Sequence, residues 1–430
     1  MAAKKPLKRD RIALVGGKRT PFTKSWSTLG DVDPVQLSTQ CVRETLFSLD
    51  VPLDAIDHII WGTVVSVPRS PNVAREIALD LNLYDVPGVT VSRACATGFD
   101  AVAYASRLIM TGEADVVVAG GVDVVSAAPV PHKKDVIDTL QKAQKQKGFN
   151  LVKTIAGVNP KDLFPSAPSI SERYTGKTMG EHAEDMVKYF DLPRAEQDAM
   201  ALDSHRKAAA AREAGHVDDQ IVTVLTKGGP VSKDNLIREE MDPDKVASLR
   251  PVFDRTNGTI TAATSSPLTD GASCVVLMRA SKAKELGFTP RAWVESWHFP
   301  AVDPRENMLL GNVTSVPFAL QKAGITLEQC DVVEIHEAFA AQVLANLRCF
   351  EDEDYCKNTL GLDEALGAVD PDKLNMWGGS IAYGHPFAAT GGRILINAMH
   401  LLEHVDGEYA ITTACAAGGL GAAMVLRRGA

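Results

Sequence analysis

LDAIDHIIWGTV, residues 53–64, and LEQCDVVEIHEAF, residues 327–339, follow one pattern, in which a helix end and an aspartate precede an apolar strand. A second pair repeats in the same order: TGEADVVVAGG (111–121) and DGEYAITTACAAGG (406–419) each place a turn before a buried strand and small residues. Helices alternate with continuous apolar strands, which predicts parallel sheets covered on both faces. The repeated order favours two duplicated α/β halves over the alternative, a chance similarity of short helix–strand units.

The material between the two halves differs in character. It is rich in charge and includes LPRAEQDAMALDSHRKAAAAREAG (192–215), a predicted helix with Pro193 in its first turn. Residues 259–281 return to strand-like, small-residue character and are expected to rejoin the first half. The predicted domains are an N-terminal domain (1–127 and 251–288), an inserted loop domain (128–250) and a C-terminal domain (289–430).

Bulk composition restricts the class of protein. At 430 residues the chain is too long for a single core, which agrees with two or three domains. Hydrophobic residues at 45% and charged residues at 23% are typical of a globular protein. The net charge of −9 argues against general nucleic-acid binding, which needs a basic face.

The cysteines and the N-terminus predict a cytoplasmic location. The cysteines are odd in number, scattered and without CxxC pairs, which favours free thiols over a disulfide scaffold or a zinc site. They lie at positions 41, 95, 274, 330, 349, 356 and 415. The N-terminus begins basic, but its apolar run at 12–15 is too short for a signal peptide. No uncharged apolar stretch is long enough to span a bilayer.

Cys95 lies in VSRACATGFDA (91–101), between an apolar strand and an apolar-periodic helix. A thiol at a helix N-terminus is expected to have a lowered pKa, because the positive end of the helix dipole stabilises thiolate. Small neighbours leave room for a substrate carbonyl, and the backbone N–H of Cys95 can point at an oxyanion. The alternative is a buried, inert cysteine.

His385 and Cys415 occupy two glycine-rich stretches near the C-terminus. In GGSIAYGHPFAATGGR (378–393), Gly384 and Pro386 place His385 on a tight turn, which suits a general base. A structural histidine bonded to backbone is the alternative. Cys415, in TACAAGGLG (413–421), ends an apolar strand, where α/β proteins place their sites. The glycines after it are expected to keep a channel open beside the sulfur. The alternative is that they serve only close packing of the backbone.

These blocks resemble the thiolase family, and within it the 3-ketoacyl-CoA thiolases that form the β subunit of the trifunctional fatty-acid oxidation complex. VSRACATGFDA is similar to the acylated-cysteine block, GGSIAYGHPFAATGGR to the histidine block and CAAGGLG (415–421) to the proton-transfer block. HEAFA (336–340) is similar to the oxyanion block. The resemblance begins at GGKRTPF (16–22), reaches the last strand, and implies a five-layered α-β-α-β-α fold with an inserted loop domain.

The resemblance also implies a role for each catalytic residue. Cys95 is then the nucleophile that accepts the acyl chain, and His385 the base that activates it. Cys415 is the acid/base that moves protons on acetyl-CoA and activates the incoming CoA thiol. His336 stands where many thiolases carry an asparagine that orients an oxyanion-hole water. The backbone N–H groups of Cys95 and Ala417 match the second oxyanion hole, with Ala417 in place of a family glycine.

Coenzyme A is implied as a substrate, with no metal or redox cofactor. NGTITAATSSPLTDGA (257–272) is similar to the stretch that contacts pantetheine, with Ser266 as the bonding serine. Arg238 occupies the place of an arginine near the adenine. At Thr178 short-chain biosynthetic thiolases carry a histidine near the acetyl group, which argues against specialisation for acetoacetyl-CoA.

The implied activity is therefore cleavage of 3-ketoacyl-CoA by CoA in fatty-acid β-oxidation, through an acyl-cysteine. The alternatives are an acetoacetyl-CoA thiolase acting in condensation, a sterol-carrier-type thiolase, a decarboxylating ketoacyl synthase and a non-catalytic thiolase-like scaffolding subunit. Cys415 in its glycine context argues against the synthase, and the four retained catalytic residues argue against the scaffold.

Residues 133–161 hold seven lysines against two aspartates inside an acidic chain. Val136, Ile137 and Leu140 are expected to share one face, and Phe149, Val152 and Ile155 another. A solvated charged helix is one interpretation. The other is a docking surface for a hydratase/dehydrogenase subunit, which the resemblance favours, or for an anionic membrane. A homodimer or tetramer is also expected.

Overall fold

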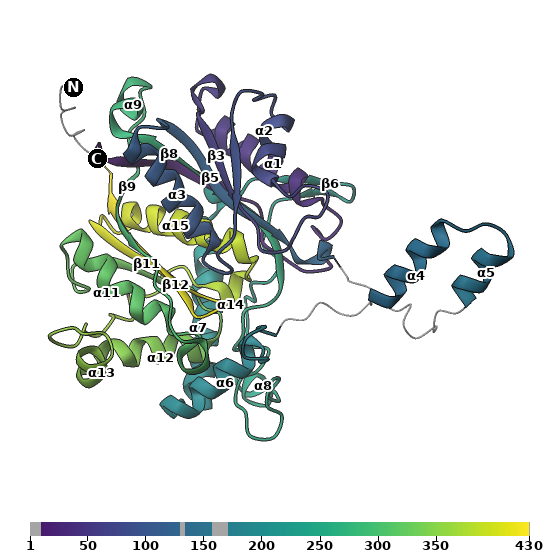
Figure 1. The fold of residues 1–430 in the computed structure, drawn as a ribbon. Coiled ribbons are helices and arrows are strands. Elements are labelled where there is room, and N and C mark those ends of the chain that lie inside the picture. Colours follow the sequence, from purple (N-terminus) through teal and green to yellow (C-terminus); the bar gives the residue numbers. More distant parts are fainter. Residues whose placement is uncertain (1–9, 130–133, 157–170, 430) are drawn as a thin grey trace, which may run out of the picture.

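One mixed sheet runs through the whole body of the molecule (Figure 1). The computed structural model describes residues 10–129, 134–156 and 171–429. Within them, ten strands follow the order β10-β11-β12-β9-β1-β8-β5-β3-β4, with the short β2 paired to β8. Their bounds are β1 Ile12–Arg19, β2 Thr23–Lys24, β3 His58–Gly62, β4 Gly88–Val91, β5 Val116–Val124, β8 Thr269–Arg279, β9 Ala292–His298, β10 Cys330–Ile335, β11 Tyr409–Ala416 and β12 Leu420–Arg428.

The two halves of this sheet repeat one arrangement of strands. The N-terminal half runs β3, β5, β8, β1, and the C-terminal half runs β10, β11, β12, β9. In each half the first pair is parallel and the next two pairs are antiparallel. The halves join where β1 pairs with β9. The predicted duplication is therefore confirmed, and β8 rejoins the first half as expected.

The sheet is mixed, whereas the sequence predicted parallel sheets. Parallel pairing is limited to β4, β3 and β5 and to β10 with β11. β12 returns from β11 through a short turn at residues 417–419, and strands joined by a tight turn run antiparallel. Both kinds of strand are covered on two faces, so both appear in the sequence as continuous apolar runs.

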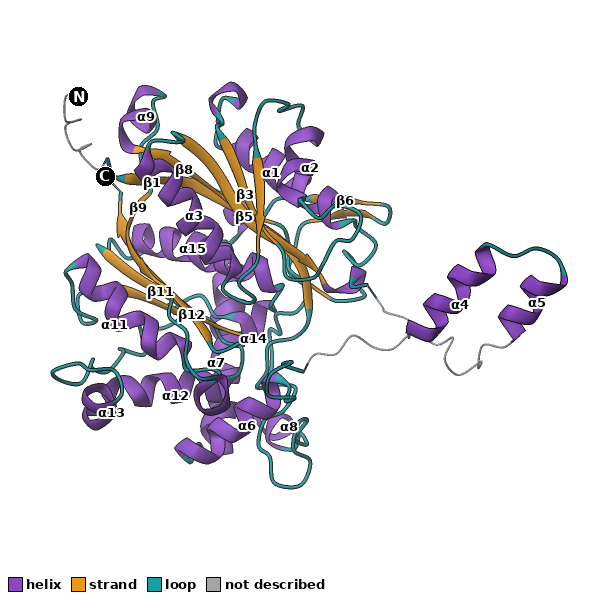
Figure 2. Ribbon diagram, in the orientation of Figure 1, coloured by secondary structure: helices purple, strands orange, loops and turns teal. Residues whose placement is uncertain are grey.

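Helices form one layer between the two halves of the sheet and one layer on each outer side (Figure 2). In the middle, α3 (Thr97–Thr111) and α15 (Phe387–His404) contact each other and strands of both halves. α1 (Pro34–Ser48) and α2 (Val73–Asp80) cover the N-terminal half. α11 (Gly311–Ala323) covers the C-terminal half, with α12 (Ala340–Glu351) beside it. This is the predicted five-layered arrangement.

Local sequence explains where these helices begin and end. The Asp33 carboxylate caps α1 by accepting the N–H of Val35, and Pro34 occupies the first turn. α3 ends at Gly112, whose φ of 76° lies in the left-handed region that glycine adopts at low cost. α15 is apolar on nearly all sides, as a helix between two sheets must be.

The first turns of α3 and α15 approach so closely that only glycine fits between them. A Cβ on Gly98 would lie 2.8 Å from the carbonyl oxygen of Ala388, and a Cβ on Gly391 would lie 2.7 Å from the nitrogen of Phe99. Cys95 lies two residues before the start of α3, and His385 lies two residues before the start of α15. The contact therefore brings together equivalent points of the two halves.

The residues between β5 and β8 lie outside the repeat. α4 (Lys134–Gln144) and α5 (Phe149–Ala156) pack against each other and project from the body (Figure 1). α6 (Met179–Phe190) and α7 (Arg194–Glu213) pack on α12 of the C-terminal half. The helix predicted at 192–215 is confirmed as α7, with Pro193 as its N-cap instead of in its first turn.

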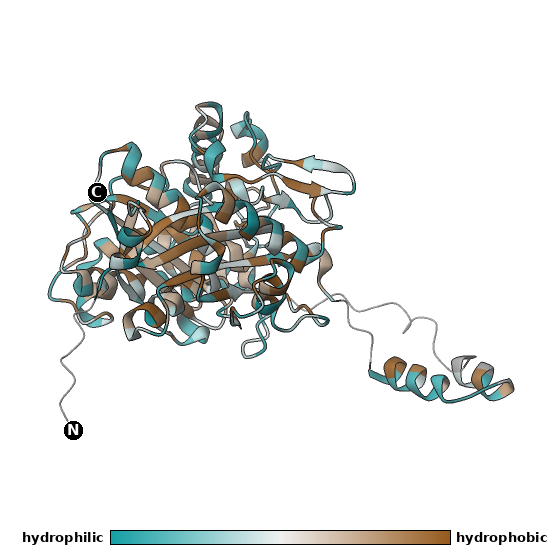
Figure 3. Cartoon of the chain, turned by 90° about the horizontal axis from the view of Figure 1, so that it is seen from above, coloured by the Kyte–Doolittle hydropathy of each residue, from teal (hydrophilic) through white to brown (hydrophobic). Residues whose placement is uncertain are grey.

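The short elements complete the chain: β6 Val224–Thr226, β7 Gly229–Val231, α8 Pro243–Ala247, α9 Ala280–Glu285, α10 Pro304–Asn307, α13 Glu353–Asn358 and α14 Ser380–Tyr383. Figure 3 shows hydrophobic strands through the centre and mixed hydrophobic and hydrophilic residues on α4 and α5. Of the helices that the structure describes, none is both long and apolar enough to cross a membrane. All seven cysteines are free, as predicted.

Replacing Gly391 by alanine should destabilise the protein. The added methyl group would meet backbone atoms of α3 that have no room to move, and such overpacking costs about 1–3 kcal/mol. This cost opposes the gain of ~1 kcal/mol that alanine brings in helix propensity. Urea denaturation should show a lower free energy of unfolding for Gly391→Ala.

Gly228→Ala is the matched control. A Cβ there would make only an ordinary contact, 3.6 Å from the Thr226 hydroxyl. We expect its free energy of unfolding to stay within about 0.5 kcal/mol of the parent. Equal stability of Gly391→Ala and the parent would show that the helix contact tolerates a side chain.

Candidate active site

Cys95 lies in a tight turn between β4 and α3. Ala94, the residue before it, has a φ of 45°, which is costly for a residue with a side chain. The Thr97 hydroxyl holds this turn, accepting from the N–H of Arg93 at 2.7 Å and donating to the carbonyl of Ala94 at 2.6 Å. Cys95 is partly exposed and lies two residues before the start of α3, at the helix N-terminus as the sequence predicted.

Cys415 lies at the end of β11, opposite Gly421 of β12, and is buried. Two residues later the backbone N–H of Ala417 lies close enough to Cys95 to lower the pKa of its thiol. The two thiols are also close enough for Cys95 to raise the pKa of Cys415. The structure therefore brings Cys95, Cys415 and Ala417 together where α3 begins and β11 ends.

Burial decides the protonation state of both thiols. It raises the pKa of Cys95 to about 11, although the N–H groups of Ala417 and of Cys95 itself act in the opposite direction. The lowered pKa expected from the helix dipole is therefore wrong, because removing the thiolate from water costs more than these dipoles return. The pKa of Cys415 is raised as well, first by burial. Both residues are protonated thiols at neutral pH.

His385 is held by bonds on both its backbone and its ring. Gly384 before it has a φ of 92°, and the His385 N–H donates to the Thr269 hydroxyl at 3.0 Å. The ring nitrogen Nδ1 lies 2.6 Å from the Thr390 hydroxyl in the first turn of α15. Burial, with a contribution from Arg393, lowers the pKa of His385 to about 3, so the imidazole is neutral.

His336 follows β10 and lies beside His385. Its backbone N–H donates to the carbonyl of Thr413 on β11 at 2.9 Å, and its ring nitrogen Nδ1 lies 2.8 Å from the Ser380 hydroxyl. The ring centroids of His336 and His385 are 4.1 Å apart. Burial first, then His385 and Arg393, lower the pKa of His336 well below its usual value.

The Nε2 atoms of both histidines are buried and have no hydrogen-bond partner in the described part of the chain. Buried polar atoms are rarely left in this state, so these two adjacent nitrogens are suited to bind a polar group of a ligand.

Asp123 of β5 interacts both with the segment that follows His385 and with Cys95. Its carboxylate accepts the N–H of Ala388, three residues after His385, at 2.7 Å, and it raises the pKa of Cys95.

Comparison with known proteins agrees with this geometry. The family model described as the N-terminal domain of thiolase matches residues 12–281, and that of the C-terminal domain matches residues 288–428. The 3-ketoacyl-CoA thiolase of Klebsiella pneumoniae (strain 342) is 44% identical over 421 residues, which cover 97% of each chain.

The chain belongs to the thiolase family. Among solved structures, it is similar to the acetyl-CoA acetyltransferase of Bacillus anthracis, with a TM-score of 0.82 and 30% identity, over 98% of this chain and 99% of that one. It is also similar to human mitochondrial 3-ketoacyl-CoA thiolase in complex with CoA, with a TM-score of 0.82 and 28% identity, over 97% and 98%. The predicted family, fold and acyltransferase class are confirmed.

Sequence reasoning assigned no role to several polar residues that surround the thiolase site. They are Asp123, Glu334, Glu337, Ser380, Thr390 and Arg393, and all are buried. Ser380, Thr390 and Arg393 stand within the glycine-rich histidine block itself. The available signal was a charged residue inside an otherwise apolar helix, because Arg393 interrupts the apolar run of α15.

The Glu337 carboxylate, next to His336 in the chain, forms hydrogen bonds to both α7 and α14. It accepts from the Ser204 hydroxyl at 2.7 Å, from the Asn375 amide at 2.7 Å and from the N–H of Ile381 at 3.1 Å. Burial raises the pKa of Glu337, while these three donors lower it. The strand end that carries His336 is thereby tied to the segment that carries His385.

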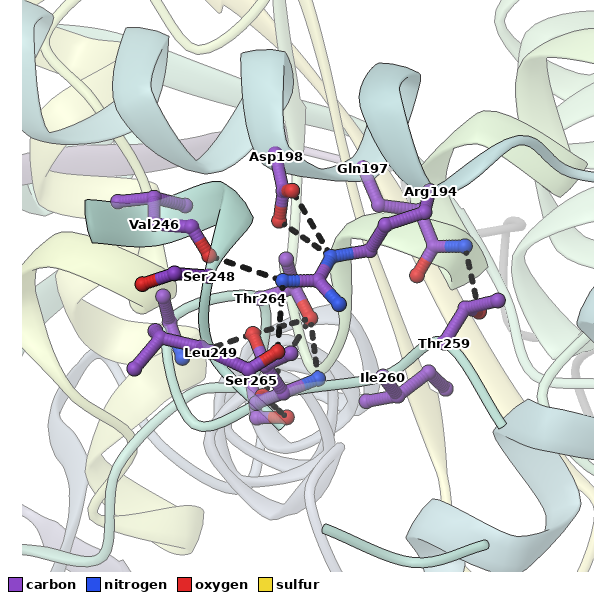
Figure 4. Close-up of polar contacts among 12 residues, drawn as sticks. Arg194, Gln197, Asp198, Val246, Ser248, Leu249, Thr259, Ile260, Thr264 and Ser265 are labelled. Atoms are coloured by element: carbon purple, nitrogen blue, oxygen red, sulfur yellow. Dashed lines mark hydrogen bonds and ion pairs between the residues drawn. The ribbon is translucent and has the colours of Figure 1, made fainter. Parts of the chain in front are cut away.

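Residues 246–260, which lead to Ser266, are fastened to α6 and α7 by polar contacts, and Figure 4 shows those with α7. The Gln197 amide donates to the Thr259 hydroxyl at 2.9 Å, and Arg194 donates to the carbonyls of Val246 and Leu249. From α6, Glu184 accepts the N–H of Ile260 at 2.9 Å. Ser266 itself donates its N–H to the carbonyl of Ala338, two residues after His336.

Arg238 and Thr178 lie on other elements. Arg238 is exposed, and its N–H donates to Nδ1 of His205 on α7 at 3.1 Å. Thr178 is the N-cap of α6 and forms a capping box with Glu181. In the described residues, no group of three or more His, Cys, Asp or Glu side chains is arranged to hold a metal ion.

Cys95 should titrate above the ordinary thiol value of 9.0, near a pKa of about 11. A raised thiol pKa means that folding disfavours the thiolate, so the proton stays on sulfur through neutral pH and leaves only in strong alkali. The measurement is the ultraviolet absorbance of thiolate in the parent minus that in Cys95→Ser, followed across pH. A midpoint below pH 8 would instead indicate a preformed thiolate at Cys95.

Proposed function

We propose that this chain is a 3-ketoacyl-CoA thiolase, which cleaves 3-ketoacyl-CoA with CoA to acetyl-CoA and a shortened acyl-CoA in fatty-acid β-oxidation. The observation that carries the proposal is the pairing of two adjacent protonated thiols, Cys95 and Cys415, with two buried, unpartnered imidazole nitrogens. The similarity to curated 3-ketoacyl-CoA thiolases over nearly the whole chain supports this specificity. CoA is the second substrate, and no cofactor takes part.

In the first half-reaction His385 takes the proton of the Cys95 thiol. A neutral imidazole has the free lone pair that this step needs, and the raised pKa of Cys95 makes a base necessary. The Cys95 sulfur then attacks the ketone carbon, and the bond to the α-carbon breaks. The electron pair leaves as the enolate of acetyl-CoA, which the Cys415 thiol protonates.

The enolate is a poor leaving group, so fixed dipoles must stabilise its oxygen. The Nε2 atoms of His336 and His385 supply the donors for the first oxyanion hole. Losing one such donor typically costs about 2.7–4 kcal/mol in barrier. The N–H groups of Cys95 and Ala417 form the second hole, which holds the thioester oxygen of the acyl-enzyme.

In the second half-reaction Cys415, now a thiolate, takes the proton of the incoming CoA thiol. The CoA sulfur attacks the acyl-Cys95 thioester, and the tetrahedral intermediate collapses to release the shortened acyl-CoA. Cys95 regains its proton from His385. We place Ser266 on the pantetheine arm of CoA, Arg238 near its adenine, and Thr178 near the acyl group.

We assign three units to this cycle. The N-terminal domain (1–127 and 251–288) supplies Cys95, the C-terminal domain (289–430) supplies His336, His385 and Cys415, and the inserted loop domain (128–250) binds CoA and contacts partners. We also infer a homodimer or tetramer in the cytoplasm. The position of β4 at the end of the sheet, where a second copy can add a strand, supports an oligomer.

An acetoacetyl-CoA thiolase that acts in condensation is the second candidate, and the structural similarity to an acetyl-CoA acetyltransferase favours it. The 44% identity to a curated 3-ketoacyl-CoA thiolase over nearly the whole chain and the threonine, instead of a histidine, at position 178 favour the first candidate. CoA-dependent cleavage of 3-ketoacyl-CoA of graded chain length separates the two. Activity on acetoacetyl-CoA alone would support the second.

The enzyme should carry the acyl group on Cys95. Incubation with acyl-CoA should add one acyl mass to the peptide that contains Cys95, and Cys95→Ser should abolish both this adduct and the cleavage of 3-ketoacyl-CoA. Peptide mass spectrometry makes the measurement. Cys415→Ser is the matched control: it should still acylate Cys95, yet lose the exchange of acetyl-CoA methyl protons with solvent. A stable adduct on Cys415, or exchange at the parent rate in Cys415→Ser, would contradict these roles.

We further propose that the α4–α5 pair docks the hydratase/dehydrogenase subunit of a fatty-acid oxidation complex. The predicted segment 133–161 lies partly outside the described residues, which include 134–156. There Lys142, Lys145 and Lys147 are exposed, as are Ile137 and Phe149. A basic surface with exposed apolar side chains suits an acidic protein face.

The predicted sharing of faces on α4 and α5 is only partly correct. Val136 is buried together with Ala143, while Ile137 and Leu140 are each 41% exposed on another side of α4. Val136 therefore packs inside the helix pair, and the two exposed residues remain available to a partner. Phe149 is 81% exposed, and the side chains of Val152 and Ile155 lie outside the described part of the structure.

Charge reversal of Lys142, Lys145 and Lys147 to glutamate should leave thiolase activity intact and abolish co-purification with the hydratase/dehydrogenase subunit. The matched control reverses Lys227, Lys284 and Lys357, which are exposed elsewhere and give the same change in net charge. Retained co-purification in the first variant would refute the docking site. Loss of binding to phosphatidylglycerol vesicles alone would instead assign the surface to a membrane.

A further inference from the structure

We propose that Arg393 and Ser380 are positioning residues that lock His336 as the Nε2–H tautomer, so that it presents a fixed hydrogen-bond donor to the substrate oxygen. The role in catalysis rests on the proposed thiolase function, whereas the tautomer itself follows from the hydrogen bonds of the free protein. His385 has no such lock, and its freedom to change tautomer matches its work as a base.

The argument starts from the guanidinium of Arg393, which can only donate hydrogen bonds. Its Nη2 donates to the Ser380 hydroxyl oxygen at 3.0 Å. Arg393 is 1% exposed, and its position is set by Glu334, whose carboxylate lies 3.7 Å from Nη1, and by the ring of Tyr383. Because Arg393 keeps its proton in any protein environment, Ser380 is always the acceptor in this bond.

Ser380 is fully buried, and its hydroxyl has a second partner in Nδ1 of His336 at 2.8 Å. Within the described chain these two are its only hydrogen-bond partners. If Nδ1 carried a proton, the hydroxyl would accept from both sides and its own proton would be buried without an acceptor. A buried donor left without an acceptor is unfavourable, because it has lost its hydrogen bond to water without gaining another. The hydroxyl proton therefore points at Nδ1, and the ring proton of His336 is on Nε2.

The Nε2 atom of His336 is the buried nitrogen without a protein partner, beside the ring of His385. The lowered pKa of His336 agrees with a neutral ring that carries one proton. The lock thus directs that single proton toward the ligand. An asparagine side chain always has an N–H to donate, whereas a neutral histidine has its N–H on either ring nitrogen. The Arg393–Ser380 pair keeps the N–H of His336 on Nε2.

His385 shows the contrast. Its Nδ1 also meets a buried hydroxyl, that of Thr390 at 2.6 Å, but no arginine donates to that oxygen. In the described structure His385 is the only side-chain hydrogen-bond partner of Thr390. The Thr390 hydroxyl can therefore either accept from Nδ1–H or donate to a bare Nδ1. His385 can accept a proton at Nε2 or hold one there, which both halves of the proposed cycle require.

The test is long-range proton–nitrogen correlation spectroscopy of the full-length free enzyme labelled with 15N-histidine. The His336 signals are assigned by their loss in His336→Asn. We expect Nδ1 of His336 to resonate as a bare nitrogen and Nε2 as a protonated one, with no change when Thr390 is replaced by valine. A protonated Nδ1, or a mixture of tautomers in the parent enzyme, would overturn the inference.

Ser380→Ala should release the lock and give mixed His336 tautomers, with a fall in kcat of about tenfold, less than the ~10²–10³-fold loss of a whole donor. Ser380→Thr retains the hydroxyl and should restore both the single tautomer and most of kcat. KM should change little in either variant. Unchanged His336 signals in a folded Ser380→Ala enzyme would also refute the lock. An inactive parent enzyme with a locked His336 would refute the thiolase function and leave the tautomer assignment standing.

Discussion

The arrangement of this protein depends on the contact between the first turns of α3 and α15. These helices are equivalent members of the two halves, and each is preceded by a catalytic candidate, Cys95 or His385. Glycine at positions 98 and 391 lets the two backbones approach more closely than any side chain would allow. A duplicated fold thus places a thiol and an imidazole at matching helix starts, and the glycine contact brings them into one site.

The same closeness sets the electrostatics of the site. A layer of helices between two halves of a sheet excludes water, and desolvation favours the neutral form of every titratable group there. It keeps Cys95 and Cys415 as thiols and both histidines as neutral imidazoles. The resting site therefore holds no ion pair between a Cys95 thiolate and a His385 imidazolium. Proton transfer from Cys95 to His385 is then a step of the reaction itself.

Buried polar groups beneath the site give this neutral site its directionality. Glu337 accepts from the Asn375 amide, Asp123 accepts the N–H of Ala388, and Arg393 donates to Ser380 beside the Glu334 carboxylate. These contacts hold the segments that carry the reacting residues. Hydrogen bonds in a dry interior are strong, and each one left unmade is costly, so a network of this kind specifies one geometry. A single hydroxyl, Ser380, then decides which nitrogen of His336 bears the proton.

The sequence by itself determined the duplication, the alternation of helices and strands, the family and the blocks that hold Cys95, His336, His385 and Cys415. These features are local, since periodicity, glycine placement and motif spacing are visible within short stretches. Only the tertiary structure decided the antiparallel pairing of most of the sheet, the raised pKa of Cys95, and the partners of Ser380, Arg393 and Asp123. The physical reason is that desolvation and hydrogen bonding depend on segments that are distant in the chain. Ser380 meets a histidine 44 residues away, and Asp123 a backbone N–H 265 residues away.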